Sequence, residues 1–235
     1  GGNDMVGRIT STNPATYTAP AEVPAGVITI TATSVADSTV SATATVTVVS
    51  SSTIRVDGVN GADGPACGTP SSPCRTITQG MSLASTGQSV DVAPGTYRFG
   101  SGGEPVPLTI NPGVALIGGG SGSTVLDFSN AFGTGVLASD GAALAGFTIQ
   151  DNDSLDVQID IASGTPSIGS NVFRDLCDRC ISTGILVRGS AAPQIISNVF
   201  GEPGAGLVTA IEVTDTATPF IVDNIIAFND TGVES

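Results

Sequence analysis

The stretch APQIISNVF, residues 192–200, occurs in the chain in two further versions. TPSIGSNVF spans residues 165–173, and TPFIVDNII spans residues 218–226. The prolines and asparagines of the three versions are 27 and then 26 residues apart. A constant period of this size is typical of a solenoid, in which each repeat buries its apolar face only against the next copy.

Each position of the repeated phrase has a structural interpretation. Proline is expected to start a strand, where its missing N–H does least harm to the sheet. The isoleucines and phenylalanines then point into the core: Ile168, Ile195, Ile221, Phe173, Phe200 and Ile226. We expect the asparagines to adopt a left-handed backbone conformation at the bend before the next strand, and their amides to bond the asparagine above and below. This stacking ladder consists of Asn171, Asn198 and Asn224.

The rest of the chain favours β-structure. Thirty-one glycines and 12% charged residues, with abundant Thr, Val and Ser, are typical of short strands and tight turns. We expect a parallel β-helix over residues 51–235, with strands at 114–117, 124–128, 143–149, 156–161 and 181–187. One helix, Thr76 to Ala84, has Ile77, Gly80, Met81 and Ala84 on one face and is expected to cap the first coil.

The sequence pattern of residues 1–50 predicts a structural segment separate from the β-helix. Two alternating runs flank a turn at residues 36–38, which is typical of a β-hairpin. The phrases YTAP, residues 17–20, and VITITATSVAD, residues 27–37, resemble the second half of a bacterial immunoglobulin-like domain. This resemblance implies a partial β-sandwich whose open edges would pair with another chain or a neighbouring domain.

Four phrases after residue 54 carry a second resemblance. They are RVDGVNGADG, SPCRTITQGMSLA, VDVAPGTY and LTINPGVALIG. They are similar to the N-terminal region of a family of secreted β-helix proteins in the pectate-lyase-like superfamily. The resemblance implies a single-stranded, right-handed parallel β-helix and says little about function.

The four cysteines form two local pairs. Six residues separate Cys67 from Cys74, and two separate Cys177 from Cys180. A tetrathiolate zinc site is the alternative, but the pairs lie far apart in the sequence. We therefore predict two disulfides and an extracellular location, either secreted or on a cell surface.

The charge excludes several classes of function. Twenty-one acidic residues oppose seven arginines, with no lysine and no histidine, for a net charge of −14. A protein with this much negative charge repels the phosphate backbone of nucleic acids. The pectin hydrolases of the superfamily carry G-H-G and R-I-K phrases, which a chain without His and Lys cannot contain. No apolar stretch is long enough to insert into a membrane.

The corner that follows the repeated phrase contains the candidate functional residues. RDLCDRC, residues 174–180, and GEPGAG, residues 201–206, interrupt the period there. Their alignment places Asp151, Asp175 and Glu202 in one column with Asp230 nearby, and stacked carboxylates favour an Arg partner or a hard cation such as Ca²⁺. For catalysis, the candidates are Arg174, Arg179, Asp175 and Asp178.

Three functions remain after these exclusions. The first is an extracellular structural or adhesive surface protein, with a self-assembling filament or stalk subunit as its specific form. The second is a polysaccharide lyase, which would use a cation and a base beside a uronic acid. The third is a binding protein for acidic polysaccharides, although no Trp and only two Tyr are present for stacking on sugar rings. The sequence favours the first.

Overall fold

The computed structural model describes residues 2–3, 5–10, 15–18, 20, 24, 26–46, 53–152, 155–177 and 183–235. The chain divides into two compact units, Gly1–Ser51 and Ser52–Ser235. The predicted boundary, after residue 50, differs from this division by one residue. Among the described residues, no helix is long and apolar enough to span a membrane.

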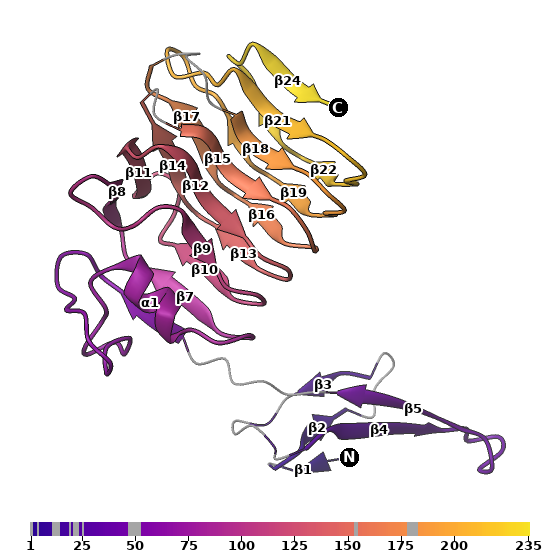
Figure 1. Ribbon diagram of the computed structural model, residues 1–235. Helices are drawn as coiled ribbons and strands as arrows, with labels where there is room; N and C mark the ends of the chain where they lie inside the picture. The colour runs from indigo at the N-terminus through magenta and orange to yellow at the C-terminus, as the bar shows by residue number, and fades with distance from the viewer. Residues whose placement is uncertain are drawn as a thin grey trace. The chain divides into compact units, whose positions relative to one another are not determined.

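The first unit contains two separate antiparallel sheets in its described residues (Figure 1). One is a three-stranded sheet of β1 (Gly2–Asn3), β2 (Gly7–Ile9) and β3 (Tyr17–Thr18). The other is a hairpin of β4 (Ile28–Thr33) and β5 (Ser41–Val46), which confirms the predicted hairpin. Its cross-strand pairs alternate between apolar pairs such as Ile28 with Val46 and hydroxyl pairs such as Thr29 with Thr45.

The second unit is a parallel β-helix, as predicted, built from three sheets of parallel strands. Figure 1 shows the strands stacked as successive rungs from magenta to yellow. The first sheet has seven strands: β6 (Thr53–Val56), β7 (Ser89–Val92), β10 (Ala115–Gly118), β13 (Ala143–Ala145), β16 (Ser167–Gly169), β19 (Gln194–Ile196) and β22 (Phe220–Val222).

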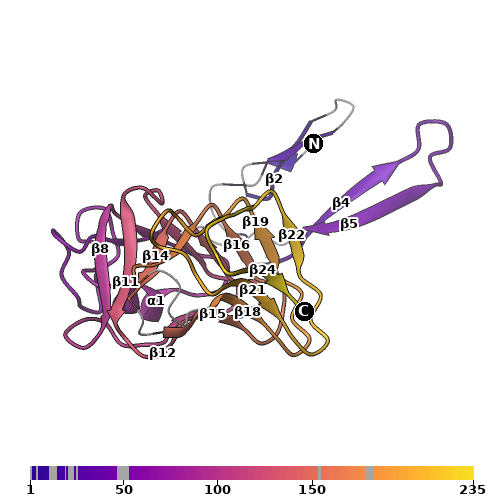
Figure 2. The same cartoon turned by 90° about the horizontal axis from the view of Figure 1, so that it is seen from above.

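The other two sheets have six strands each. The second sheet consists of β8 (Gly95–Gly100), β11 (Thr124–Asn130), β14 (Thr148–Asp151), β17 (Val172–Asp175), β20 (Val199–Phe200) and β23 (Ile225–Ile226). The third consists of β9 (Leu108–Ile110), β12 (Gly133–Ala138), β15 (Leu155–Ile161), β18 (Thr183–Val187), β21 (Thr209–Val213) and β24 (Thr231–Glu234). Figure 2 shows the stack from above.

The core consists of inward side chains stacked on their counterparts in the neighbouring coils. Ile168 lies in register with Ile195, and both are fully buried. The rings of Phe173 and Phe200 stack with their centroids 4.5 Å apart. At the last coil, Ile221 and Ile226 are only partly buried. The repeated phrase therefore supplies the core of three successive coils, because each copy places its apolar side chains over those of the copy before.

The three asparagines of the repeat form a hydrogen-bonded column, which we call the Asn ladder. The side-chain oxygen of Asn198 accepts hydrogen bonds from the backbone N–H and the side-chain amide of Asn171, at 3.0 and 3.2 Å. The oxygen of Asn224 accepts the same two bonds from Asn198, at 2.9 and 3.1 Å. Each side-chain amide also donates to a carbonyl of the preceding coil, as Asn198 does to Ile168 at 2.9 Å.

The left-handed residue at this bend differs from our prediction. The residue before each asparagine has the positive φ: 57° at Ser170, 57° at Ser197 and 56° at Asp223. The asparagine itself is not among the positive-φ residues, because its side chain must lie along the stack to reach the neighbouring amide. Gly146 has a φ of 80° at the corresponding position one coil earlier. This bend divides the predicted strand 143–149 into β13 and β14.

The one helix in the described part of the chain, α1 (Ile77–Leu83), covers the first coil as predicted. Its buried residues are Ile77, Gly80 and Met81, and a Cβ on Gly80 would lie 2.7 Å from a methyl group of Val56 in β6. A small residue is therefore required where the helix packs on the sheet. The hydroxyl of Thr76 accepts a hydrogen bond from the N–H of Gln79, which caps the first turn of the helix.

Candidate functional site

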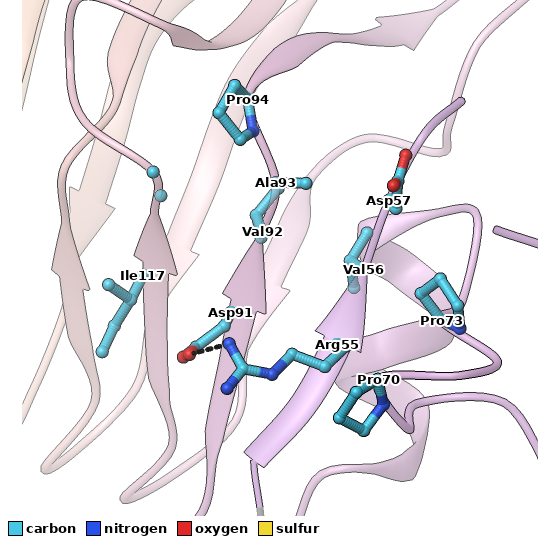
Figure 3. A pocket seen from close by; sticks show the side chains of 12 residues that line it. Arg55, Val56, Asp57, Pro70, Pro73, Asp91, Val92, Ala93, Pro94 and Ile117 are labelled. Carbon is cyan, nitrogen blue, oxygen red and sulfur yellow. Dashed lines mark hydrogen bonds and ion pairs between the residues drawn. The ribbon is translucent and has the colours of Figure 1, made fainter. Parts of the chain in front are cut away.

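The first candidate site is a groove of about 440 Å³ on the outer face of β6, β7 and β10 (Figure 3). One wall is the loop that contains Pro70 and Pro73, and the opposite wall includes Ile117. The loop is closed by the Cys67–Cys74 disulfide, which confirms that predicted pair. The groove therefore lies where a covalently closed loop projects beside a flat sheet.

An ion pair occupies the floor of this groove. Arg55 on β6 and Asp91 on β7 are adjacent outward residues, and Nη1 of Arg55 lies 2.6 Å from Oδ2 of Asp91 (Figure 3). The third charged residue, Asp57, accepts hydrogen bonds from Asn60 and Val59. These bonds hold the pKa of Asp57 below its ordinary value, with those from Asn60 contributing most. The charged groups of the groove are thus bound to the protein itself.

The predicted carboxylate column is present only in part. Asp151 and Asp175 end β14 and β17 in register, and both side chains are fully buried. Oδ1 of Asp151 accepts a hydrogen bond of 2.6 Å from the amide of Gln158, which also donates to the carbonyl of Arg174 at 2.8 Å. Oδ1 of Asp175 accepts one from the N–H of Cys177 at 2.9 Å. The two aspartates are therefore bonded into the corner of the coil.

Our placement of Glu202 in this column is wrong. Its carboxylate lies 3.2 Å from Nη1 of Arg174, the outward neighbour of Asp175. The chain leaves the sheet at Gly201, whose φ is 81°, and Glu202 forms a bridge with Ala205 instead of continuing β20. Asp230 is exposed near the last coil. Within the described residues, no group of three or more His, Cys, Asp or Glu side chains could hold a metal ion.

Several predicted residues fall outside the described ranges. Asp178, Arg179 and Cys180 are among them, so their catalytic roles and the Cys177–Cys180 pairing stay predictions. Cys177 itself is disulfide-bonded. Of the two catalytic candidates that are described, Asp175 is bonded as above, and Arg174 binds the side-chain oxygen of Gln150 through Nε at 3.1 Å and Nη2 at 2.7 Å, as well as Glu202.

The sequence interpretation missed a second column, which we call the outer polar ladder. It runs along the outer face of the second sheet and consists of Arg98, Asp127, Gln150, Arg174 and Glu202. Arg98 lies 3.6 Å from Asp127, and Gln150 bonds both Asp127 and Arg174. The sequence signal for its strand residues is a polar residue directly after a buried one, as in Phe173 followed by Arg174.

Burial and hydrogen bonding act in opposite directions on Asp127. Burial alone would raise the pKa of this carboxyl group. The hydroxyl and N–H of Ser129, the amide of Gln150 and the charge of Arg98 favour the ionised form and outweigh burial. The pKa of Asp127 is therefore lowered, and its charge is a fixed part of the outer polar ladder.

Together, the three parallel sheets, the capping helix and the self-bonded polar columns define a parallel β-solenoid protein. The family comparison agrees with this class. Residues 59–235 match the family described as a protein of unknown function (DUF1565), and the chain belongs to that family. Comparisons with curated proteins and with solved structures gave no match.

Proposed function

We propose that this protein is an extracellular structural protein of a cell surface, acting as a stalk or adhesive module. The observation that carries the proposal is where the arginines are bound. Four ion pairs join residues of different coils: Arg55 with Asp91, Arg98 with Asp127, Arg174 with Glu202, and Arg188 with Asp160. These ion pairs tie neighbouring coils together, as a structural role requires.

Two further observations support the extracellular location and the surface role. The Cys67–Cys74 disulfide is typical of an oxidising compartment. The hairpin of the first unit has no charged residue in either strand, and among the described residues each strand is paired on one side only. An immunoglobulin-like partner strand from a neighbouring domain would complete this sheet by β-augmentation, as expected for a module of a surface protein.

Surface labelling and solution size together test the proposal. We expect a membrane-impermeant biotin reagent or an antibody to label the protein on intact producing cells. Light scattering after size-exclusion chromatography then distinguishes a stalk module from a filament subunit. A stalk module stays monomeric, whereas the molar mass of a filament subunit rises with protein concentration. A protein confined to the cytoplasm with reduced cysteines would contradict the proposal.

A polysaccharide lyase is the second candidate, and one observation favours it. The side-chain oxygen of Gln158 is buried beside the buried Asp151 and has no hydrogen-bond partner among the residues that the structure describes. An unsatisfied buried oxygen of this kind is costly, and a bound water or cation would satisfy it. We expect a lyase to release unsaturated products that absorb in the ultraviolet from polygalacturonate with Ca²⁺. No absorbance change at high enzyme concentration, and no shift of the melting temperature with Ca²⁺, would exclude this candidate.

A further inference from the structure

A second groove, of about 550 Å³, lies between α1, β8 and the loop that follows β8. Polar and apolar atoms contribute about equally to its lining, which carries hydroxyl groups and two arginines rather than exposed aromatic rings. Side chains that line it include Arg75, Thr78, Ser82, Thr96, Arg98 and Glu104. Figure 1 shows α1 and β8 at the same end of the stack.

The two arginines of this groove have unused hydrogen-bond donors. Among the described residues, the Arg75 guanidinium makes no ion pair and no hydrogen bond; only its backbone N–H does, to Asp63. The Arg98 side chain is 74% exposed and approaches Asp127 only through Nε, at 3.6 Å. A guanidinium has five N–H donors, so most of those on Arg75 and Arg98 remain available to a ligand.

The carboxylates beside the groove are, in contrast, occupied. Oε1 of Glu104 accepts a hydrogen bond of 3.0 Å from the N–H of Ile77, and Oε2 accepts two of 2.7 Å from the N–H and hydroxyl of Thr78. Asp63 accepts the N–H groups of Arg75 and Thr76 at 2.8 and 3.0 Å. The groove therefore offers free donors, while the carboxylates beside it already bind the protein.

We infer that this groove binds a glycan that carries carboxylate groups, with Arg75 and Arg98 as the binding residues. Arginine binds carboxylates through two parallel hydrogen bonds, which recognises shape as well as charge. The exposed hydroxyl of Thr96 suits the sugar hydroxyls between the charged groups. The inference does not depend on the structural role proposed above, because a stalk with or without this site would hold the same fold.

The net charge of −14 does not prevent such binding. At physiological salt, the screening length is about 8 Å, so the groups that line the groove decide the local interaction. The groove of Arg55 is the natural comparison within the same protein. There the arginine is paired with Asp91 at 2.6 Å, and a second carboxylate, Asp57, lines the same groove, so negative charge already faces an incoming anion.

Calorimetric titration with a defined oligogalacturonate tests the inference. We expect the wild-type protein to bind it and to bind the methyl-esterified oligomer of the same length at least tenfold more weakly. Arg75→Gln and Arg98→Gln should each weaken binding by about tenfold, the value of one charge-assisted hydrogen-bond pair. Arg55→Gln is the matched control and should leave affinity unchanged.

Three results would overturn the inference. They are no heat of binding at millimolar oligogalacturonate, equal affinity for the methyl ester, and equal affinity of the two groove variants and the wild type. A poly-glutamate peptide of equal charge separates glycans from acidic peptides, and equal binding of the peptide would reject the ligand class. Arg75→Lys and Arg98→Lys keep the charge without the guanidinium fork, and full affinity in both would reject bidentate binding. Circular dichroism confirms that each variant is folded.

Discussion

The Asn ladder and the outer polar ladder tie the same coils together in different surroundings. Asn171 and Asn198 are almost completely buried, and each bonds the coil before and the coil after. Arg98 and Arg174, in the outer polar ladder, have side chains that are 74% and 30% exposed. A buried polar group left without a partner is costly, whereas an exposed ion pair contributes little. We therefore expect the buried Asn ladder to contribute more to the stability of the fold than the exposed outer polar ladder.

The largest expected effect is that of Asn198→Ala. The substitution leaves the N–H of Asn171 and the carbonyl of Ile168 without their partners in the interior. We expect the free energy of unfolding to fall by about 3 kcal/mol, measured by urea denaturation followed by circular dichroism. Gln194→Ala, an exposed position in the same coil, is the control and should change it by less than about 0.5 kcal/mol. A loss below about 1 kcal/mol for Asn198→Ala would mean that water replaces the ladder.

The second effect depends on pH and concerns Asp127. Its pKa is lower in the folded protein than in the unfolded chain, so the carboxylate stabilises the fold above its ordinary pKa of about 3.9. That contribution is lost as the pH falls through the lowered value. Asp127→Asn lacks it, so the difference in stability from the wild type should shrink from about pH 5 toward pH 2. A difference that stays constant over this range would show that the charge contributes nothing.

A smaller effect is expected for Arg174→Gln. The substitution removes the bonds to Gln150 and Glu202 on a partly exposed surface, and Glu202 can turn to water. We expect a loss of about 1 kcal/mol in the same denaturation experiment. Arg174→Lys tests the geometry, since lysine keeps the charge but cannot bond both neighbours in one plane. A loss as large as that of Asn198→Ala would erase the contrast between the two ladders.

The smallest effect is expected for Arg98→Gln. Its single contact with Asp127 is 3.6 Å long and exposed. The change in the free energy of unfolding should be below about 0.5 kcal/mol. The same substitution is expected to weaken glycan binding. The stability of the Arg98→Gln variant therefore shows whether weaker binding comes from the missing guanidinium or from a disturbed fold. A strongly destabilised variant would place Arg98 among the residues that hold the fold.

The sequence predicts the interior because the interior repeats. Ile168, Ile195 and Ile221 recur with the asparagines at a nearly constant period, so a single pattern identifies the strands and the core. The general tolerance of asparagine for a left-handed backbone predicts the bend at the asparagine itself. The structure places it on Ser170 and Ser197, because the asparagine side chain is needed for the ladder.

The outer surface could not be predicted in the same way. Members of the outer polar ladder are 23 to 29 residues apart, since the turns between strands vary in length. Glu202 was misplaced because Gly201 turns the chain away from the sheet, which no alignment of carboxylates can show. The grooves depend on loops and on the packing of α1, so only their arginines are visible in the sequence.

The Asn ladder also bears on how such a protein changes over generations. Asn171 and Asn198 each bond the coil before and the coil after, and the bonds from one asparagine to the next recur in both steps of the ladder. Gain or loss of one whole coil would leave every remaining amide with an equivalent partner, while a change of a few residues would break the column. We therefore expect related proteins to differ in length by whole coils.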